Sequence, residues 1–312
     1  MFEILLIIAP VFIIILAGYI SCSLRYIGPE TSDVINALSI KFTLPVLLFQ
    51  AMYHLDFSRA LNGPMLFGFY SGAIASFVVA GLLGRLLWKR RPGEAVAVGF
   101  CAFFTNGVLL GLPITERAFG TEALNLAYGI ISIHTPIVYS IGMISMELAR
   151  RDGAPLGVTI KKTLTSIFSN PLMIGLLLGI FSNQVGLPIP QPLMVAIDMI
   201  AEGALPIAIF GVGVALTRYT IKAEIFESLV ISGIALIFYP ALVFGITHYV
   251  FALPKLYVQA AVTVAAMPAG FNIYIFASLY NRAMGLAASV LLLSTLLSVI
   301  SISLWLQLLQ NL

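Results

Sequence analysis

Two polar stretches interrupt apolar segments of the chain. The first, FFTNGVLLGLPITER, covers 103–117 and contains Asn106, and the second, MPAGFNIY, covers 267–274 and contains Asn272. An asparagine amide is neutral and donates hydrogen bonds, which suits an oxyanion better than a bare cation. The two stretches are therefore candidate anion-binding segments.

Both stretches also carry residues that break helices, namely Gly107, Gly111 and Pro113 in the first and Pro268 and Gly270 in the second. Interrupted backbone cannot face lipid, because each unpaired polar group costs several kcal/mol there. The freed N–H and C=O groups must therefore line a cavity or pack against protein, and half-helix N-termini favour an anion. A plain proline kink, satisfied by neighbouring helices and water, is the alternative for either break alone.

The composition is that of an integral membrane protein. Of the 312 residues, 60% are hydrophobic and only 9% are charged, whereas a soluble protein carries about 25% charged residues. The net charge of +3 without a basic, aromatic stripe excludes a nucleic-acid partner. The chain has no HExxH motif, membrane aspartate pair or Ser–His dyad, so we expect neither an enzyme nor a cofactor. Cys22 and Cys101 lie in apolar segments as packing residues.

Apolar segments of about 20 residues can span a bilayer, and this chain contains ten of them. The expected spans are 2–24, 34–53, 64–88, 95–115, 123–148, 163–182, 193–216, 228–251, 257–279 and 286–308. The first lacks a basic leader region and a cleavage site, so we interpret it as a span and not a cleavable signal.

The distribution of basic residues predicts the orientation of these spans. Twelve of the 16 Lys and Arg residues follow odd-numbered spans: Arg25, Arg85, Lys89, Arg90, Arg91, Arg150, Arg151, Lys161, Lys162, Arg218, Lys222 and Arg282. Only Arg59, Arg117 and Lys255 follow even-numbered ones, and Lys41 lies within a span. Since basic loops stay in the cytoplasm, both termini are expected outside, in a plasma membrane such as the bacterial inner membrane.

A repeat relates the two halves of the chain at an offset of 161. It aligns Pro10, Gly18 and Ser21 with Pro171, Gly179 and Ser182, and Leu44, Pro45 and Phe49 with Leu205, Pro206 and Phe210. The same offset places 106–113 on 267–274. Five spans per half is an odd number, so the second half would be inverted. We therefore expect one membrane unit, 1–312, built from repeats 1–150 and 163–312, as is typical of secondary transporters.

The motifs along the chain resemble those of the auxin efflux carrier family, which includes plant carriers and bacterial malonate or malate permeases. The residues that carry the resemblance are Asn36 with Leu44-Pro45-x-Leu47-Leu48-Phe49, Asn106-Gly107-x-x-x-Gly111-x-Pro113, Ala204-Leu205-Pro206-Ile207-Ala208-x-Phe210-x-x-Gly213, and Met267-Pro268 followed by Asn272. The resemblance covers essentially the whole chain, in the compact form that lacks the large cytoplasmic loop of the long plant carriers.

The resemblance implies an all-α fold of ten transmembrane helices in two inverted five-helix repeats, like sodium/proton antiporters and bile-acid symporters. Helices 1, 2, 6 and 7 would form a scaffold, and helices 3–5 and 8–10 a transport domain in which broken helices 4 and 9 cross. It also implies an elevator mechanism and a homodimer joined through the scaffolds.

The resemblance also implies roles for individual residues. Asn106 and Asn272 would contact the substrate carboxylate, Pro113 and Pro268 would mark the breaks, and Gly107, Gly111 and Gly270 would let backbone approach the ligand. An apolar scaffold wall would be formed by Leu44, Pro45, Val46, Leu205 and Pro206.

Four ionisable residues within spans have open roles. Lys41 could attract an organic anion or snorkel to the inner interface. Asp198 and Glu202, one turn apart, could bind a proton or sodium ion or be interfacial carboxylates. His134 could relay protons or be a packed, hydrogen-bonded residue.

The sequence thus predicts a secondary transporter for a small organic anion such as malonate, malate or an auxin-like aromatic carboxylate, coupled or not to Na+ or H+. The alternative is a sodium- or proton-coupled cation antiporter, or a bile-acid-type symporter, on the same fold. An antiporter would be expected to carry a buried Asp near the crossing, where this chain has asparagines.

Overall fold

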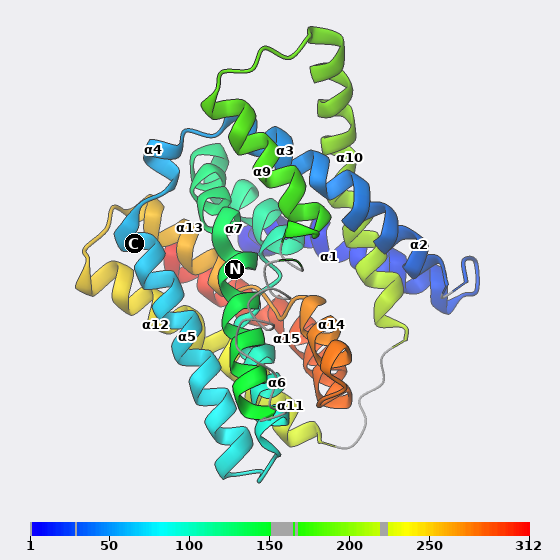
Figure 1. Cartoon of the computed structure of the whole chain (residues 1–312), viewed down its shortest axis with the longest axis vertical. Coiled ribbons are helices and arrows are strands. Elements are labelled where there is room, and N and C mark those ends of the chain that lie inside the picture. Colours follow the sequence, from blue (N-terminus) through cyan, green and yellow to red (C-terminus); the bar gives the residue numbers. More distant parts are fainter. Residues whose placement is uncertain (1, 29, 151–164, 166–167, 219–223) are drawn as a thin grey trace. The chain divides into compact units, whose positions relative to one another are not determined.

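The computed structural model describes residues 2–28, 30–150, 165, 168–218 and 224–312, and this part of the chain is mainly helical (Figure 1). Seven of its helical stretches are long and apolar enough to cross a membrane. Apart from the short helix Phe57–Ala60, the helices overlap the ten predicted segments, but 95–115 and 257–279 are broken and 163–182 is described mainly from residue 168. The structure therefore supports an all-α membrane protein, and ten crossings stay a prediction.

The chain divides into two compact units. Unit 1 comprises 1–8, 61–163 and 219–312, and unit 2 comprises 9–60 and 164–218. The helices of unit 1 are α5 (Gly63–Leu86), α6 (Pro92–Phe103), α7 (Leu112–Arg150), α11 (Ile225–Gly233), α12 (Tyr239–Phe244), α13 (Lys255–Ala265), α14 (Asn272–Tyr280) and α15 (Met284–Gln310). Unit 2 contains α2 (Thr31–Leu38), α3 (Leu44–His54), α4 (Phe57–Ala60), α9 (Pro171–Gln184), α10 (Gln191–Leu216) and most of α1 (Phe2–Ser23).

Several predicted features lie outside the described residues. These are Arg151, Lys161, Lys162 and Lys222, which belong to the basic residues predicted to lie in the cytoplasm, and the side chains of Asn36 and Arg150.

Three prolines each follow a π-helical turn. The turns η1 (Ser39–Thr43), η2 (Gly107–Gly111) and η3 (Ile234–Phe238) precede Pro45, Pro113 and Pro240. In each turn the residue just before the proline donates its N–H to the carbonyl five positions back. Proline lacks an N–H and its ring collides with the carbonyl four residues earlier, so a wider turn accommodates it.

Asparagine caps start two of the helices that follow loops. The Asn62 Oδ1 accepts the N–H of Met65 at 2.9 Å at the start of α5, and the Asn170 Oδ1 accepts that of Leu172 at 2.9 Å at the start of α9. A proline occupies the first turn of both helices, where its missing N–H costs nothing.

Glycines in unit 2 bring pairs of helices into backbone contact. A Cβ at Gly18 of α1 would collide with the carbonyl oxygen of Phe210 in α10, and one at Gly179 of α9 would lie 2.5 Å from the carbonyl oxygen of Phe49 in α3. Small residues allow this close approach between membrane helices. The two pairs are related by the sequence offset of 161, so each contact joins one half of the chain to the other in an equivalent way.

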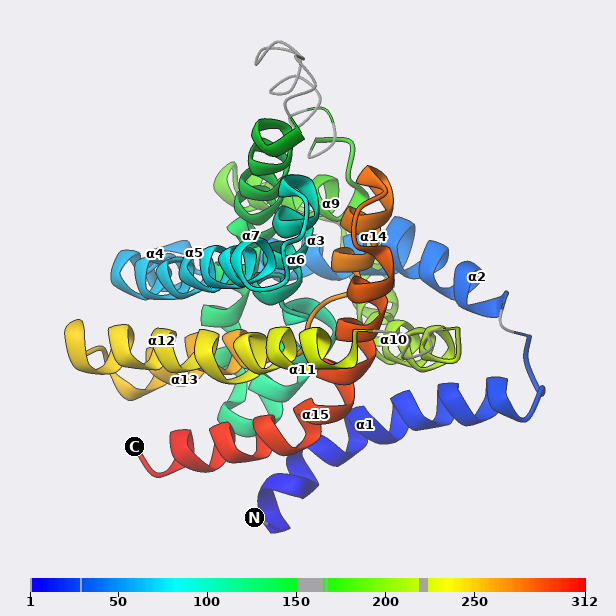
Figure 2. The same ribbon diagram turned by 90° about the horizontal axis from the view of Figure 1, so that it is seen from below.

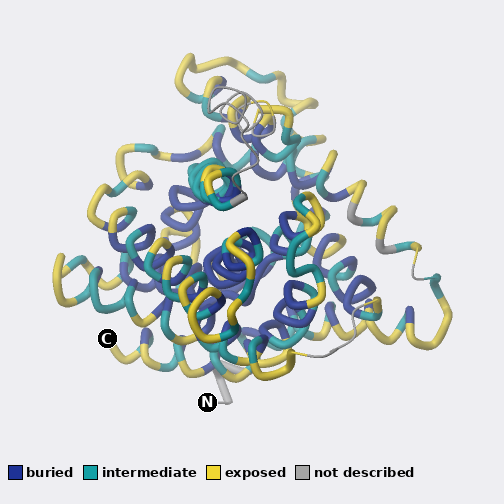
Figure 3. The backbone as a smooth tube through the Cα atoms, turned by 60° about the horizontal axis from the view of Figure 1, so that its bottom comes forward, coloured by how far each residue is buried: buried dark blue, intermediate teal, exposed yellow. Residues whose placement is uncertain are grey.

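Unit 1 surrounds a buried interior. Its residues 225–250 form one continuous helical rod, in which α11 and α12 are joined by η3 and extended by η4 (Gly245–Val250) (Figure 2). From Val258 to Gly270 every residue is buried, and buried residues are dark blue in Figure 3. The segments that were predicted to break therefore lie at the centre of this unit.

An ion-pair cluster in unit 1 connects the loop between α5 and α6 with the start of α11. Arg90, in the loop between α5 and α6, contacts Glu224 at 2.6 Å and Glu227 at 2.8 Å at the start of α11. Burial acts to lower the pKa of Arg90, but its hydrogen bonds and charge interactions with the two glutamates outweigh burial and raise that pKa. The two ion pairs tie the loop to α11.

Candidate functional site

The two predicted helix breaks are present in unit 1. Helix α6 ends at Phe103, the backbone is extended at Phe104 (φ −90°, ψ 93°), and helical structure resumes at Gly107. Helix α13 ends at Ala265 and α14 starts at Asn272. Each break interrupts a segment that the sequence predicted as a single span.

The two breaks bind each other through their backbones. Thr105 and Ala269 form an isolated antiparallel bridge, in which the Asn106 N–H donates to the Pro268 carbonyl at 2.7 Å and the Gly270 N–H donates to the Phe104 carbonyl at 2.9 Å. All of 104–106 and 266–270 are buried. The broken helices thus satisfy part of each other's freed backbone, which hydrocarbon could not do. We call 104–106 together with 266–272 the crossover.

A serine of α15 binds a third backbone group of the crossover. The Ser294 Oγ accepts the N–H of Ala269 at 3.2 Å and donates to the Leu291 carbonyl at 3.4 Å. Without this hydroxyl the buried N–H of Ala269 would lose its partner, at a cost of about 1–3 kcal/mol.

The two crossover asparagines have different surroundings. Asn106 follows the bridge residue Thr105 and is 9% exposed, and no described residue hydrogen-bonds to its side-chain amide. Asn272, three positions after Ala269, is half-buried, and its Oδ1 accepts a hydrogen bond from the hydroxyl of Tyr139 in α7 at 3.2 Å. In this orientation the Asn272 Nδ2 points its two N–H donors away from Tyr139.

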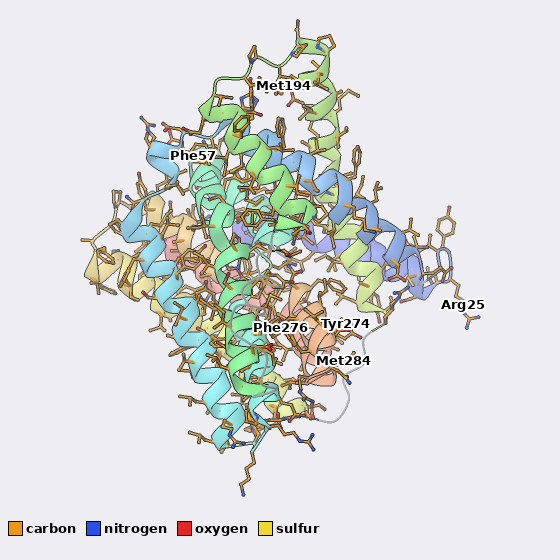
Figure 4. The ribbon with its side chains drawn as sticks, viewed as in Figure 1. Arg25, Phe57, Met194, Tyr274, Phe276 and Met284 are labelled. Carbon is orange, nitrogen blue, oxygen red and sulfur yellow. The ribbon has the colours of Figure 1, made fainter. Side chains whose placement is uncertain are left out.

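Aromatic rings pack beside the crossover. Phe276, labelled in Figure 4, stacks on Phe100 of α6 with ring centroids 3.8 Å apart. Tyr139 lies 5.6 Å from the rings of both Phe100 and Phe104. These contacts surround the Tyr139–Asn272 hydrogen bond with apolar surface, where polar interactions are stronger than in water.

The predicted glycines permit close packing at the crossover. A Cβ at Gly270 would lie 3.2 Å from the Thr105 carbonyl oxygen, one at Gly107 would lie 3.2 Å from Val264, and one at Gly111 would lie 3.3 Å from the Met267 side chain.

The role predicted for Pro113 is wrong, because it does not mark the first break. That break covers 104–106, and Pro113 is the second residue of α7, after the π-helical turn η2. Pro268, in contrast, lies within the second break and contributes a carbonyl to the bridge. The first interruption coincides with the Thr105–Ala269 pairing, whereas Pro113 follows the π-helical turn η2.

The predicted wall residues belong to unit 2. Leu44 is buried in α3, and Pro45 and Val46 follow it half-buried. In α10, Leu205 is half-buried and Pro206 is exposed.

The charged candidates other than His134 also belong to unit 2. Lys41 is exposed in the turn η1, and Glu202 is exposed on α10. The Asp198 carboxylate accepts a hydrogen bond from the Gln50 Nε2 at 2.7 Å, which joins α10 to α3.

His134 lies in unit 1, beside the crossover. It is 5% exposed, and its ring centroid is 5.3 Å from that of Phe104. Neither ring nitrogen has a hydrogen-bond partner in the described part of the chain. His134 is therefore packed among rings, and the choice between a proton relay and a structural residue stays open.

Tyr139 and Ser294 are the site residues that the sequence did not indicate. Both are common polar residues inside long apolar helices, and their partners, Asn272 and Ala269, are 133 and 25 positions away. No local spacing rule connects residues so far apart, so only the folded chain identifies these pairs.

Comparison with known proteins places the chain among membrane transporters. The model of the family described as "Membrane transport protein" matches residues 4–306. An "Uncharacterized transporter" of Methanothermobacter thermautotrophicus is 27% identical over 305 residues, covering 95% of both chains. A "Putative malonate transporter" of Rhizobium meliloti is 23% identical, covering 97% of this chain and 95% of its own. "Auxin efflux carrier component 8" of Arabidopsis thaliana is 22% identical, covering 87% of this chain and 88% of its own.

The family match spans nearly the whole chain, and the apolar helices and the paired breaks agree with a protein that moves solutes across a bilayer. The chain therefore belongs to the membrane transport protein family that includes the auxin efflux carriers, and it is a transporter and not an enzyme.

Proposed function

We propose that this transporter carries a small organic anion whose carboxylate binds at Asn106 and Asn272. Two relatives bear names that refer to malonate and to auxin, and these solutes have a carboxylate in common. We infer a carboxylate substrate of the malonate or malate class, and an auxin-like aromatic carboxylate fits the same chemistry.

The observation that carries the proposal is the crossover with its two asparagines. The bridge occupies the backbone groups of Phe104, Asn106, Pro268 and Gly270, so the side-chain amides are left as hydrogen-bonding groups at its edge. The Asn272 amide is already oriented by Tyr139, with its N–H donors directed elsewhere. Two neutral donors beside buried backbone suit one carboxylate.

The charge of the crossover favours an anion over a cation. The stretches 103–113 and 266–274 contain no aspartate or glutamate. A buried cation would need a carboxylate or a larger set of oxygen ligands to offset its desolvation. The cation antiporter therefore has less support than the organic-anion transporter.

The division into two units supports an elevator mechanism. Unit 1 contains the crossover and the helices expected in a transport domain, and unit 2 contains those expected in a scaffold. The repeat-related contacts of Gly18 with Phe210 and Gly179 with Phe49 favour a rigid, twofold-symmetric scaffold. In this proposal unit 1 carries the bound anion across the bilayer while unit 2 stays in place, joined to a second scaffold in a homodimer.

The test is uptake of radiolabelled malonate by proteoliposomes that contain the purified protein. We expect Asn106→Ala and Asn272→Ala each to reduce uptake at low substrate concentration roughly 10- to 100-fold, because a hydrogen bond to a charged group contributes about 1.5–3 kcal/mol. Asn311→Ala, at the exposed end of the chain, is the control and should transport normally. Wild-type uptake by both crossover variants would refute the site.

A second pair of variants separates anion from cation transport. Asn106→Asp and Asn272→Asp keep the side-chain shape and replace the donor with an acceptor that can become negative. Anion uptake should be lost in both, whereas a cation carrier would keep or gain activity. Sodium or proton flux that rises in the aspartate variants would support the antiporter instead.

A further inference from the structure

We propose that His134 binds the proton that is transported together with the anion, so that this carrier is a proton–anion symporter. This inference rests on the proposed function, because it assigns the coupling ion of the same site.

The first observation is that His134 is isolated from hydrogen-bonding groups. Its side chain is 5% exposed, and both Nδ1 and Nε2 lack a partner among the described residues. A buried polar group without a partner is rare, and each one requires an explanation such as water or a functional ligand. Since a neutral imidazole has one free lone pair, the smallest ligand that His134 can accept is a proton.

The second observation is the set of rings around His134. The rings of Phe104 and Phe69 are steeply inclined to that of His134, with centroids 5.3 and 5.7 Å away, and Tyr70 lies 6.2 Å away in a more parallel arrangement. Aromatic faces attract a cation at such distances. They cannot replace a counter-ion, so the imidazolium needs an anion nearby to be stable in this interior.

The charged groups that the structure describes do not supply that anion. The titratable side chain that faces His134 from α5 is Tyr70, whose hydroxyl donates to the Ile130 carbonyl, and Tyr239 of α12 lies behind Phe69. The other titratable side chains that the structure describes on α5, α6, α7 and α13 are Arg85, Glu94, Cys101, Glu116, Arg117, Glu122, Tyr128, Tyr139, Glu147, Lys255 and Tyr257. The carboxylates among them are at least twelve positions from His134 in the sequence, and none hydrogen-bonds to it in the described part of the chain.

The third observation is that His134 is one side chain away from the proposed anion site. Its neighbour Phe104 is part of the backbone bridge and is two positions before Asn106. The ring of Phe104 also contacts Tyr139, which holds Asn272. A carboxylate bound at the two asparagines would therefore be a nearby negative charge for a protonated His134.

Thermodynamic linkage then couples the two ligands. If the anion stabilises the protonated imidazole, protonation must increase the anion affinity by the same factor. The proton binds Nδ1 or Nε2 from the solution on one side of the membrane and is released on the other side when the anion leaves. No other bond forms or breaks, and each transported anion carries one proton with it.

The test is isothermal titration of purified protein with malonate, repeated at about pH 6.5 in buffers of different ionisation enthalpy to count the protons taken up on binding. Wild type should take up roughly one proton more per malonate than His134→Gln, because malonate's own titration is common to both. His248→Gln, whose ring stacks on Phe244 and is remote in sequence from the crossover, is the matched control and should match wild type.

Three outcomes decide the question. Equal proton uptake by wild type and by His134→Gln, with both binding malonate, overturns the symport and leaves the anion site intact. A wild-type protein that binds no small carboxylate overturns the proposed function and this inference with it. A proton excess confined to proteins that retain His134 supports the symport.

A measurement on the wild type alone covers the case in which His134→Gln fails to fold. Proteoliposomes that contain a pH-sensitive dye should acidify inside when an inward malonate gradient drives uptake. Malonate entry without acidification would overturn the proposal.

Discussion

The two asparagines of the crossover would contribute unequally to binding. Asn106 has its backbone fixed by the bridge to Pro268 and its amide free of described partners, whereas Asn272 has its amide fixed by Tyr139. An amide can present either its oxygen or its N–H groups to a ligand. Tyr139 selects the N–H groups of Asn272, and such preorganisation lowers the entropic cost of binding an anion.

Removing the Tyr139 hydroxyl tests this selection. In Tyr139→Phe the Asn272 amide loses one hydrogen bond worth about 1 kcal/mol, so we expect KM for malonate to rise about fivefold with little change in maximal rate. Tyr128→Phe removes a hydroxyl from the same helix that is not bonded to either asparagine, and it should leave KM unchanged. An equal rise in KM for both variants would show a general effect of helix α7 and not of this contact.

At the scale of elements, the crossover shows how two helices can be interrupted inside a membrane. Antiparallel pairing at Thr105 and Ala269 gives the breaks a short piece of sheet, and Ser294 caps one more N–H. In the bridge, the N–H groups of Asn106 and Gly270 play equivalent parts, because each donates to the carbonyl on the far side of the Thr105–Ala269 pair. Residues 105 and 269 differ by 164, which is three more than the offset of the scaffold motifs. Asn272 therefore does not occupy the position equivalent to Asn106, although the sequence offset had aligned both stretches.

Helix packing in unit 2 depends on glycine where backbones touch. A Cβ at Gly213 of α10 would collide with the Ile15 carbonyl of α1, whereas one at Gly203 of the same helix would meet only the Ile207 side chain, at 3.7 Å. We expect Gly213→Ala to cost about 2 kcal/mol and to lower Tm by about 4–8 °C, because backbone atoms cannot move aside as a side chain can. Thermal unfolding of the purified protein measures this change.

Gly203→Ala is the matched control for that substitution and should keep the wild-type Tm or raise it slightly, since alanine is the better helix former. If Gly213→Ala were as stable as Gly203→Ala, helices α1 and α10 would not be in backbone contact in the protein.

At the scale of the whole molecule, the excess of positive charge on odd-numbered loops predicts which face lies in the cytoplasm. Part of that charge, at Arg25, Arg85, Lys89, Arg90 and Arg91, lies at helix ends that the structure describes. Arg25 extends outward beyond the end of α1 (Figure 4). Positive side chains at these ends resist translocation, so they favour the cytoplasmic side.

Labelling of introduced cysteines tests the orientation. Cys22 and Cys101 are buried and should react little, so wild type is the blank. In intact cells a membrane-impermeant maleimide should label Arg59→Cys, in α4. It should label Arg91→Cys only after the membrane is opened. The opposite pattern would invert the predicted topology.

The sequence alone determined the class of the protein, the approximate positions of its helices and the existence of both interruptions. It also indicated the two asparagines, Asn106 and Asn272, that lie at these interruptions. These features are local: apolar length, glycine and proline content and side-chain chemistry act within a few residues of where they occur. The same local rules misplaced one break at Pro113, because a proline shows that a helix must adjust without showing where its backbone finds new partners.

Only the tertiary structure decided which groups meet. The pairing of Thr105 with Ala269, the hydrogen bond from Tyr139 to Asn272, the cap from Ser294 and the apolar surroundings of His134 all join residues that are distant in the sequence. Such contacts arise when buried polar groups must find partners inside a packed interior. That requirement is met by the arrangement of several helices at once, and no single stretch of sequence contains it.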